Sequence, residues 1–572
     1  MRIEISSPAG IVCYKMDLQG RCLVHRQLLE HIAPYCDDKE GGFRPMKSNL
    51  GKKLTLVMAI MVALLVAALP AMACTSVVVG KLASADGSVM TTHTCDGRYE
   101  FRIGVIPAKD WAAGALRPVF KGGGTGEDVA DRTKVADIPQ VAHTYKYFDI
   151  AYPFANENQV MMGETTIGGR RELQNKNGIF EIWELQRVGL ERAKTAREAI
   201  QIMGAMAEKY GYGDGGECLT VIDGNEAWFF EIYGAGPLEV GAIWAAQRVP
   251  DDQVGVSANR SRIGVIKEND PNNFMYSSNV FSYAKELGWW DPAKGPLNYA
   301  TVYGFKDSVY NTRREWRALS LIAPSLNLDP WAVEYPFSVK PDKKVTVEDL
   351  MKIKRDHYEG TAFDLTKGMA AGPFGNPNRY PTPATLGEWE RAISIFRCSY
   401  SVIMQARAWL PAAIGGVIWF GEDAPHSTCY VPIYAGATSV PASFTIGRRD
   451  VLDRNSAWWA FNLVSNFADL KYSYMIKDIE ETFTKFEKDA RAIQPTVEKT
   501  AAELYKVDPK LAVSFLTDYS NSNAQKVVDE WWKLFDKLAV KYQDGYVNLK
   551  TVGYPDEWLK AVGFSKIVRP AK

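Results

Sequence analysis

A cysteine, Cys74, stands between two patterns of different purpose in the stretch LPAMACTSVVVG (69–80). Ala71-Met72-Ala73 is typical of a signal-peptide cleavage site, and the β-branched residues after Cys74 predict a buried strand. Cleavage before Cys74 would place a thiol and a free α-amine on one residue. Free thiols titrate near ~8.5 and α-amines near ~7.7–8.0, so the amine can accept the thiol proton and return it to a leaving amine. The pattern predicts a nucleophile that carries its own general base.

Two other interpretations of Cys74 stay open. The cysteine could be acylated as the anchor of a lipoprotein, or it could stand at this junction by accident. A lipid-attachment motif usually has Leu three residues before the cysteine and small residues after it. Here Ala71 and Met72 fill the first two places, so the match to that motif is poor.

The residues before the cysteine predict an export signal. Lys47, Lys52 and Lys53 form a basic start, and Leu54–Leu69 is an uncharged, mostly apolar run of 16 residues. As a helix this run would reach only ~24 Å, short of a ~30 Å hydrocarbon core, so a transmembrane helix is the weaker alternative. We expect a signal peptide over 46–73 that engages the membrane only in transit. The protein would be exported to the periplasm, the cell surface or the exterior.

The residues after Cys74 predict a β-hairpin. Residues 75–80 and 89–96 are strand-like, and Asp86-Gly87 supplies the turn between them. The second strand would bring Asp96 back toward the start of the first, where its carboxylate could orient the amine. The alternative is that Asp96 is an ordinary turn residue.

The rest of the chain alternates helices and hairpins. The spacing predicts a helix over 180–193, a second helix that begins with a capping box at Thr195, and two strands about a turn at 223–225. From about 450 onward, apolar residues at spacings of three and four predict helices. This order favours helices layered over antiparallel sheets. The C-terminal helices would either cover the core or offer a face to a partner.

Composition excludes several classes of function. Lys plus Arg and Asp plus Glu both number 67, and this zero net charge argues against nucleic acid as the main partner. The chain has no C-x-x-C and no H-E-x-x-H, so we expect no metal and no cofactor. Four of the five cysteines from residue 74 onward could pair as two disulfides. The sequence leaves the oligomeric state open, a homo-oligomer included.

The predicted mature start resembles that of the PepD-like dipeptidases. The shared residues are Cys-Thr-x-x-x-Val-Gly-Lys, then Ala-Ser-x-Asp-Gly-Ser, then an aspartate. These enzymes are N-terminal nucleophile cysteine hydrolases related to the secernins and, more distantly, to bile salt hydrolases and penicillin V acylases. Further similar stretches follow in family order at 155–167, 181–234, 254–263, 335–368, 371–380 and 405–436.

The resemblance implies an α+β fold, a four-layer αββα sandwich with two antiparallel sheets between helical layers. It would occupy residues 74–449, with a helical region over 450–572 packed on this core. Residues 46–73 would be the signal peptide, and residues 1–45 a non-native extension upstream of a start at Met46. The implied activity is hydrolysis of dipeptides or short peptides, with broad side-chain tolerance and no metal.

The resemblance also implies catalytic roles for three residues. Cys74 matches the nucleophile, Asp96 the aspartate after the second strand, and Asn259 in VSANRS the asparagine that binds the oxyanion. One departure concerns the residues before the aspartate, where relatives often have Arg or Lys followed by Asn. This chain has His93 there, which would steady a thiolate only when protonated.

Substrate contacts implied by the resemblance come from two further segments. Arg379 would bind the substrate carboxylate. Glu164, Thr165 and Thr166 stand where relatives have part of the substrate wall, and their polar groups could point into the site or simply close a strand. Two rival functions remain beside the dipeptidase. One is an amidase of the same fold that hydrolyses N-acyl amides, and the other is a non-enzymatic lipoprotein acylated at Cys74.

Overall fold

The computed structural model describes residues 2–7, 10–16, 22–23, 74–122, 132–236, 240–305, 308–380 and 390–563. The chain divides into two compact units, Met1–Ala71 and Met72–Lys572. In the first unit, a small antiparallel sheet has the order β1 (Arg2–Ser7), β2 (Gly10–Met16) and β3 (Cys22–Leu23). The predicted signal peptide lies outside the described residues, and so does the transmembrane alternative. Among the helices described, none is both long and apolar enough to span a membrane.

The second unit contains an eight-stranded sheet in which all neighbouring strands are antiparallel. The predicted hairpin around residues 223–225 is confirmed as two neighbouring strands of this sheet, β14 and β15. In spatial order the strands are β18 (Phe274–Tyr276), β16 (Ala242–Val249), β15 (Ala227–Gly234), β14 (Glu217–Ile222), β13 (Met161–Thr166), β12 (Ala155–Asn156), β11 (Tyr147–Asp149) and β6 (Gly104–Ile106).

A seven-stranded antiparallel sheet holds the hairpin that follows Cys74. The predicted hairpin is confirmed, with Val78 opposite Thr91 and Val79 opposite Met90. In spatial order the strands are β19 (Ser338–Val339), β17 (Val254–Ser257), β4 (Ser76–Val79), β5 (Val89–Asp96), β20 (Cys398–Ala406), β21 (Val417–Glu422) and β22 (Val431–Tyr434). Two small ladders pair β7 (Lys109–Asp110) with β10 (His143–Thr144) and β8 (Leu116–Lys121) with β9 (Thr133–Pro139).

The two large sheets face each other, with β13 and β14 of one against β4 and β5 of the other. Gly163 on β13 lies at the closest approach, where a Cβ would stand 2.5 Å from the main-chain oxygen of Thr92. Beside it, the hydroxyls of Thr91 and Thr220 form a 2.6 Å hydrogen bond between the sheets. Only glycine fits this position, and the resulting contact sets the spacing of the sheets near the start of β4.

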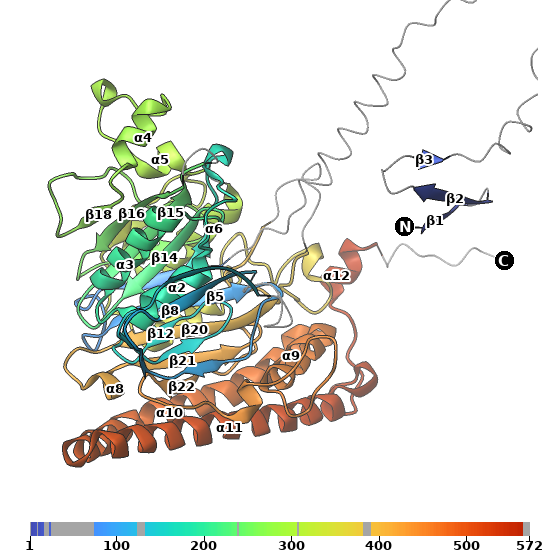
Figure 1. Cartoon of the computed structure of the whole chain (residues 1–572). Coiled ribbons are helices and arrows are strands. Elements are labelled where there is room, and N and C mark those ends of the chain that lie inside the picture. Colours follow the sequence, from blue (N-terminus) through green and yellow to red (C-terminus); the bar gives the residue numbers. More distant parts are fainter. Residues whose placement is uncertain are drawn as a thin grey trace, which may run out of the picture. The chain divides into compact units, whose positions relative to one another are not determined.

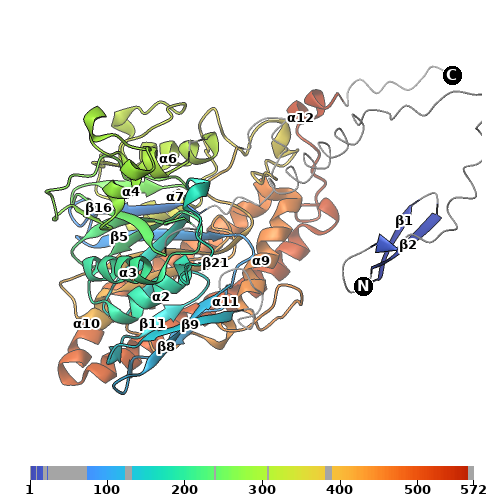
Figure 2. The ribbon, with the colours of Figure 1, turned by 45° about the horizontal axis from the view of Figure 1, so that its top comes forward.

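Two helices lie on the eight-stranded sheet, α2 (Ile182–Arg192) and α3 (Ala196–Tyr210), and Figure 2 shows them side by side. The predicted start of the second helix is confirmed, because the Thr195 hydroxyl accepts from the Glu198 N–H at 3.2 Å. The Glu198 carboxylate accepts from the N–H of Lys194 at 2.7 Å. In a capping box the Glu198 carboxylate would accept from the N–H of Thr195; here it accepts from the N–H of the preceding residue instead.

The seven-stranded sheet is contacted by α6 (Val309–Ile322), α7 (Val347–Lys354) and the C-terminal helices. The helical region predicted from about 450 onward is confirmed as α9 (Ala457–Ala468), α10 (Tyr472–Val507) and α11 (Pro509–Lys541). Figure 1 shows α10 and α11 as a long pair beneath β22, with which α11 is in contact. The fold is therefore mixed α and β, with antiparallel sheets and a helical C-terminal region.

Short elements complete the fold. The remaining α-helices are α4 (Val280–Glu286), α5 (Tyr299–Tyr303), α8 (Ala412–Gly415) and α12 (Asp556–Ala561). Turns of 3₁₀ helix lie at Arg171–Leu173, Pro292–Lys294, Pro324–Leu326, Met369–Ala371, Ala442–Phe444, Asp469–Lys471 and Gln543–Gly545. In the described part of the chain all cysteines are buried free thiols, so the two disulfides considered from the sequence are not formed there; these thiols are Cys74, Cys95, Cys218, Cys398 and Cys429.

Candidate active site

Cys74 lies two residues before β4, which stands between β17 and β5 in the seven-stranded sheet. The register of β17 against β4 places Asn259 beside Cys74 when it is extended by two residues. The register of β5 against β4, extended in the same way, places Cys95 on the other side. The thiol-bearing residue is 3% exposed. The two strands of the first hairpin and a strand from much further along the chain, β17, therefore meet around one buried sulfur.

The thiol of Cys74 contacts a carboxylate from the opposite sheet. Sγ donates to Oε2 of Glu164 on β13 at 3.2 Å, and Oε1 of the same carboxylate accepts from the Thr166 hydroxyl at 3.1 Å. His93 on β5 lies beside the pair, with its Nδ1 2.9 Å from the main-chain oxygen of Glu164. The sequence placed Glu164 in the segment that relatives use as part of the substrate wall but gave it no catalytic role.

Burial dominates the protonation of this group. It raises the pKa of the Cys74 thiol well above its usual value, and the neighbouring charges of Glu164 and Asp96 add to the effect. Burial also raises the pKa of Glu164 to about 7 and lowers that of His93 to about 3. A neutral His93 cannot steady a thiolate by its charge. In the uncut chain the Cys74 nitrogen belongs to an amide and cannot accept the thiol proton. The thiol therefore stays protonated and donates a hydrogen bond to Glu164.

A buried arginine, Arg314 on α6, joins the ends of β4 and β17. Its guanidinium donates to the main-chain oxygen of Cys74 at 2.7 Å, to the Thr75 hydroxyl at 2.9 Å and to the main-chain oxygen of Ala258 at 3.0 Å. A fourth bond, 2.8 Å long, goes to Oδ1 of Asn259. Arg314 therefore holds the predicted nucleophile, Cys74, and the predicted oxyanion ligand, Asn259, in fixed positions relative to each other.

Two further cations reach the same strand ends. Arg391 forms a fully buried ion pair with Asp96, whose other oxygen, Oδ1, has no hydrogen-bond partner among the described residues. Lys354 on α7 donates from Nζ to the main-chain oxygen of Thr75. Burial lowers the pKa of Lys354 to about 7. Arg391 thus binds a side chain, and Lys354 a main-chain oxygen, close to Cys74.

The predicted oxyanion ligand, Asn259, has a left-handed backbone conformation with φ of 66°. Its Nδ2 donates to the main-chain oxygen of Thr166 at 2.7 Å, so Asn259 and Thr166 belong to the same group as Cys74. Thr165 is fully buried, and its hydroxyl lies 2.6 Å from that of Ser257 between the sheets. In this structure the Thr165 hydroxyl contacts Ser257, and its contact with a substrate stays a prediction.

Arg379 lies in the segment after the 3₁₀ turn at 369–371. Its guanidinium donates to main-chain oxygens of Asn376 at 2.9 Å, Asn378 at 3.0 Å and Leu365 at 2.6 Å. These bonds shape its own loop, whereas Arg314 and Arg391 supply the cationic contacts around Cys74. Binding of a substrate carboxylate by Arg379 stays a prediction.

Comparison with known proteins identifies the family. The profile of peptidase family C69 matches residues 130–485, more than half of the chain. The chain belongs to peptidase family C69. The predicted membership of the PepD-like dipeptidase family is confirmed, and with it the enzyme class of peptide hydrolase. The matched part contains Glu164, Asn259, Arg314, Lys354 and Arg391, whereas the cysteine and the aspartate of the first hairpin precede it.

Several curated relatives of this C69 peptidase are named as dipeptidases. A probable dipeptidase of Salmonella dublin is 31% identical over 385 residues, which are 64% of this chain and 81% of that protein. A probable dipeptidase of Latilactobacillus sakei is 28% identical over 68% of this chain and 79% of its own length. Dipeptidase A of Lactobacillus helveticus is 25% identical over 72% of this chain and 84% of its own length.

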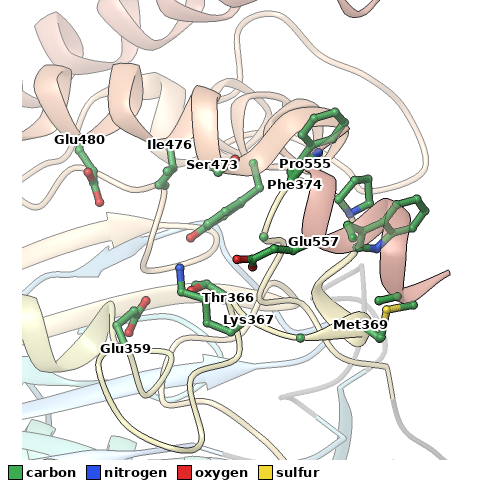
Figure 3. Close-up of a pocket in the computed structure, with 17 residues that line it drawn as sticks. Glu359, Thr366, Lys367, Met369, Phe374, Ser473, Ile476, Glu480, Pro555 and Glu557 are labelled. Carbon is green, nitrogen blue, oxygen red and sulfur yellow. The ribbon is translucent and has the colours of Figure 1, made fainter. Parts of the chain in front are cut away.

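This C69 peptidase also has a cavity of about 660 Å³ that does not include Cys74. Figure 3 shows its wall, with Glu359, Thr366 and Lys367 on one side and Ile476 and Glu480 of α10 on the other. Side chains near α12 close one end. The cavity is a separate feature from the buried thiol.

Proposed function

We propose that this protein is an exported cysteine dipeptidase in which Cys74, freed as the first residue, attacks the peptide bond. The family and the dipeptidase names of its relatives support the reaction and the substrate class. One observation carries the assignment of the nucleophile. The Cys74 thiol lies 3.2 Å from a carboxylate and in one hydrogen-bonded frame with the Asn259 side chain.

The reaction would begin when the α-amine of the freed Cys74 accepts the thiol proton. Sulfur then attacks the scissile carbonyl carbon, and the oxygen becomes an oxyanion that accepts from Asn259 Nδ2 and main-chain N–H groups. The amine returns the proton to the leaving nitrogen as the peptide bond breaks, which leaves a thioester. Water attacks the thioester, releases the second product and restores the thiol.

Asp96 and Arg314 would position the reacting groups of Cys74 and Asn259. Oδ1 of Asp96 is buried with no partner among the described residues, and a free ammonium on Cys74 would supply a donor. Arg314 binds the Cys74 carbonyl and Asn259 Oδ1 together, so it is a positioning residue. We keep Arg379, Thr165 and Thr166 as the proposed contacts to the substrate.

The proposed fold is the four-layer αββα sandwich of N-terminal nucleophile hydrolases. Its support is the contact of the two antiparallel sheets through β4, β5, β13 and β14, with α2 and α3 packed on one sheet and α6, α7 and α11 on the other. Export through a signal peptide at 46–73 and broad side-chain tolerance belong to the same proposal.

The test measures hydrolysis of a dipeptide panel by the native, secreted protein and by Cys74→Ala. We expect cleavage of several dipeptides by the native protein, loss of at least ~10³-fold in Cys74→Ala, and unchanged activity in the buried-thiol control Cys429→Ala. Cleavage at the parent rate by Cys74→Ala would exclude this nucleophile.

A second measurement separates the rival functions. The intact mass and N-terminal sequence of the native protein should show Cys74 as an unmodified first residue. An added acyl chain would indicate the lipoprotein instead. Hydrolysis of N-acyl amino acids without dipeptide cleavage would indicate the amidase.

A further inference from the structure

Three buried side chains at the site combine the ligand types that bind zinc. In the part of the chain that the structure describes, Cys74 Sγ, a ring nitrogen of His93 and a carboxylate oxygen of Glu164 all lie within 4.8 Å of one another. Each of the three residues is fully or almost fully buried. Thiolate, imidazole and carboxylate are the usual protein ligands of Zn²⁺, at ~2.0–2.3 Å, so tetrahedral ligand atoms stand ~3.3–3.8 Å apart. Side-chain movements of about 1 Å would close this group around an ion.

One ring nitrogen of the histidine has protein partners and the other has none among the described residues. Nδ1 lies 2.9 Å from the Glu164 main-chain oxygen and 3.2 Å from the Glu164 main-chain nitrogen, and Nε2 is buried with no hydrogen-bond partner there. In the tautomer with the proton on Nδ1, that proton goes to the carbonyl and Nε2 has a bare lone pair. Metal-binding histidines commonly donate their second N–H to a main-chain carbonyl in this way.

The carboxylate is oriented as well. Oε1 of Glu164 accepts from Thr166, so Oε2 is the oxygen that faces the sulfur. The formal charges of the three ligands match one divalent cation, because a thiolate and a carboxylate carry two negative charges and the imidazole is neutral.

We propose that Cys74, His93 and Glu164 form an inhibitory Zn²⁺ site, with the freed α-amine of Cys74 as the fourth ligand. Binding forms four bonds to the ion, from sulfur, amine nitrogen, imidazole nitrogen and carboxylate oxygen. The thiol proton passes to solvent, the ammonium form of the amine likewise releases one proton to solvent, and no oxidation state changes. Sulfur and amine of one residue close a five-membered chelate ring.

The consequence for activity rests on the proposed function. The ion would occupy the lone pairs of the sulfur that attacks and of the amine that carries the proton. Zinc would therefore compete with the dipeptide, and removal of the ion by a chelator would restore the enzyme. Metal binding itself does not depend on what the enzyme hydrolyses.

The direct test is titration of the processed protein with Co²⁺ as a spectroscopic substitute, followed by Zn²⁺ displacement. We expect one equivalent of tetrahedral cobalt with visible d–d bands and a thiolate charge-transfer band in the near ultraviolet. Both bands should disappear when zinc is added. His93→Gln should weaken Zn²⁺ affinity by at least ~10-fold, and Cys74→Ala should remove the charge-transfer band.

A surface histidine provides the matched control. His143 pairs with Asp110 at 2.6 Å in an exposed ladder, so His143→Gln should leave the stoichiometry and affinity at the site unchanged. Loss of the bound equivalent in His143→Gln, or no thiolate band in the parent, would overturn the proposal. Glu164→Gln gives a second variant with nearly the same volume, and it should also weaken binding.

Activity assays then separate this proposal from the dipeptidase proposal. Inhibition by micromolar Zn²⁺, relieved by a chelator, would support both. The thiolate band without any dipeptide hydrolysis would leave the metal site standing and overturn the dipeptidase. Dipeptide hydrolysis unaffected by zinc, with no thiolate band, would overturn the metal site alone.

Discussion

Arg314 donates to Oδ1 of Asn259 at 2.8 Å and thereby fixes which end of the amide faces the neighbouring strand. The Nδ2 end then donates to the Thr166 main-chain oxygen at 2.7 Å. The same guanidinium holds the carbonyl of Cys74 at 2.7 Å. The orientation of the proposed oxyanion ligand is therefore set by a residue on α6 and does not depend on substrate.

Replacement of this arginine tests its positioning role. We expect Arg314→Lys to reduce kcat by about 10²-fold with little change in KM, because one ammonium cannot replace the four contacts that the planar guanidinium makes with the ends of β4 and β17. Arg317→Lys on the same helix is the control, since Arg317 pairs with Asp356 instead. Equal losses in both variants, or a loss confined to KM, would speak against the role.

The contact between the sheets at Gly163 predicts a large effect of a small substitution. A methyl group there would stand 2.5 Å from Thr92 O and 2.8 Å from the Thr220 hydroxyl, so the sheets would have to separate. We expect Gly163→Ala to lower the free energy of unfolding by about 1–3 kcal/mol. Gly215→Ala, at a position with open space around it, should change it by less than about 1 kcal/mol in the same urea titrations. Matching values for the two variants would show that the sheets are not held at this spacing.

The buried ion pair of Asp96 and Arg391 predicts an asymmetry between single and double variants. Asp96→Asn leaves the Arg391 charge buried without its counter-ion, and we expect a loss of about 3–5 kcal/mol in unfolding free energy. Combining it with Arg391→Met should recover part of that loss, because the buried charge that lost Asp96 is then removed as well. The exposed pair of Asp450 and Arg448 offers the control Asp450→Asn, whose effect should stay below about 1 kcal/mol. Additive losses in the double variant would contradict this account.

Lys354 predicts a pH dependence of stability. Burial lowers its pKa from 10.5 to about 7, so between these values the unfolded chain holds a proton that the folded protein has released. The free energy of unfolding therefore rises with pH across this window, by at most ~1.4 kcal/mol per pH unit from this group. We expect Lys354→Met to flatten the rise that urea unfolding measures between about pH 7 and 9. Lys352→Met, at an exposed position of the same helix, should keep the parent slope. An unchanged slope in Lys354→Met would assign the rise to other groups.

Most secondary structure was predictable because it depends on neighbours in sequence. The hairpin of β4 and β5 follows from alternating strand residues around Asp86-Gly87, and the start of α3 follows from the Thr195 cap. Apolar residues three and four positions apart after residue 450 likewise predicted the helices α9, α10 and α11. These patterns need no knowledge of which segments meet.

The buried cations around Cys74 were not predicted, although the sequence pattern around two of them, Arg314 and Lys354, indicates that they are buried. Arg314 stands four residues before Ala318 and eight before Ile322, on the buried stripe of α6. Lys354 follows Leu350 and Met351 on the buried stripe of α7. A cation on an apolar stripe indicates a buried partner. Which partner it meets is decided by packing, since Arg314 binds a carbonyl 240 residues away in sequence.

The contacts that hold Cys74 in place share one property. Arg314 binds its carbonyl oxygen, Lys354 binds the next carbonyl, and the Thr75 N–H donates to Thr94 at 3.1 Å. All of them lie on the C-terminal side of the Cys74 Cα atom. A cut before Cys74 would remove none of them. The main chain that carries the thiol would therefore be held by the same contacts before and after the cut. Maturation would create one new ammonium group inside a scaffold that is already assembled.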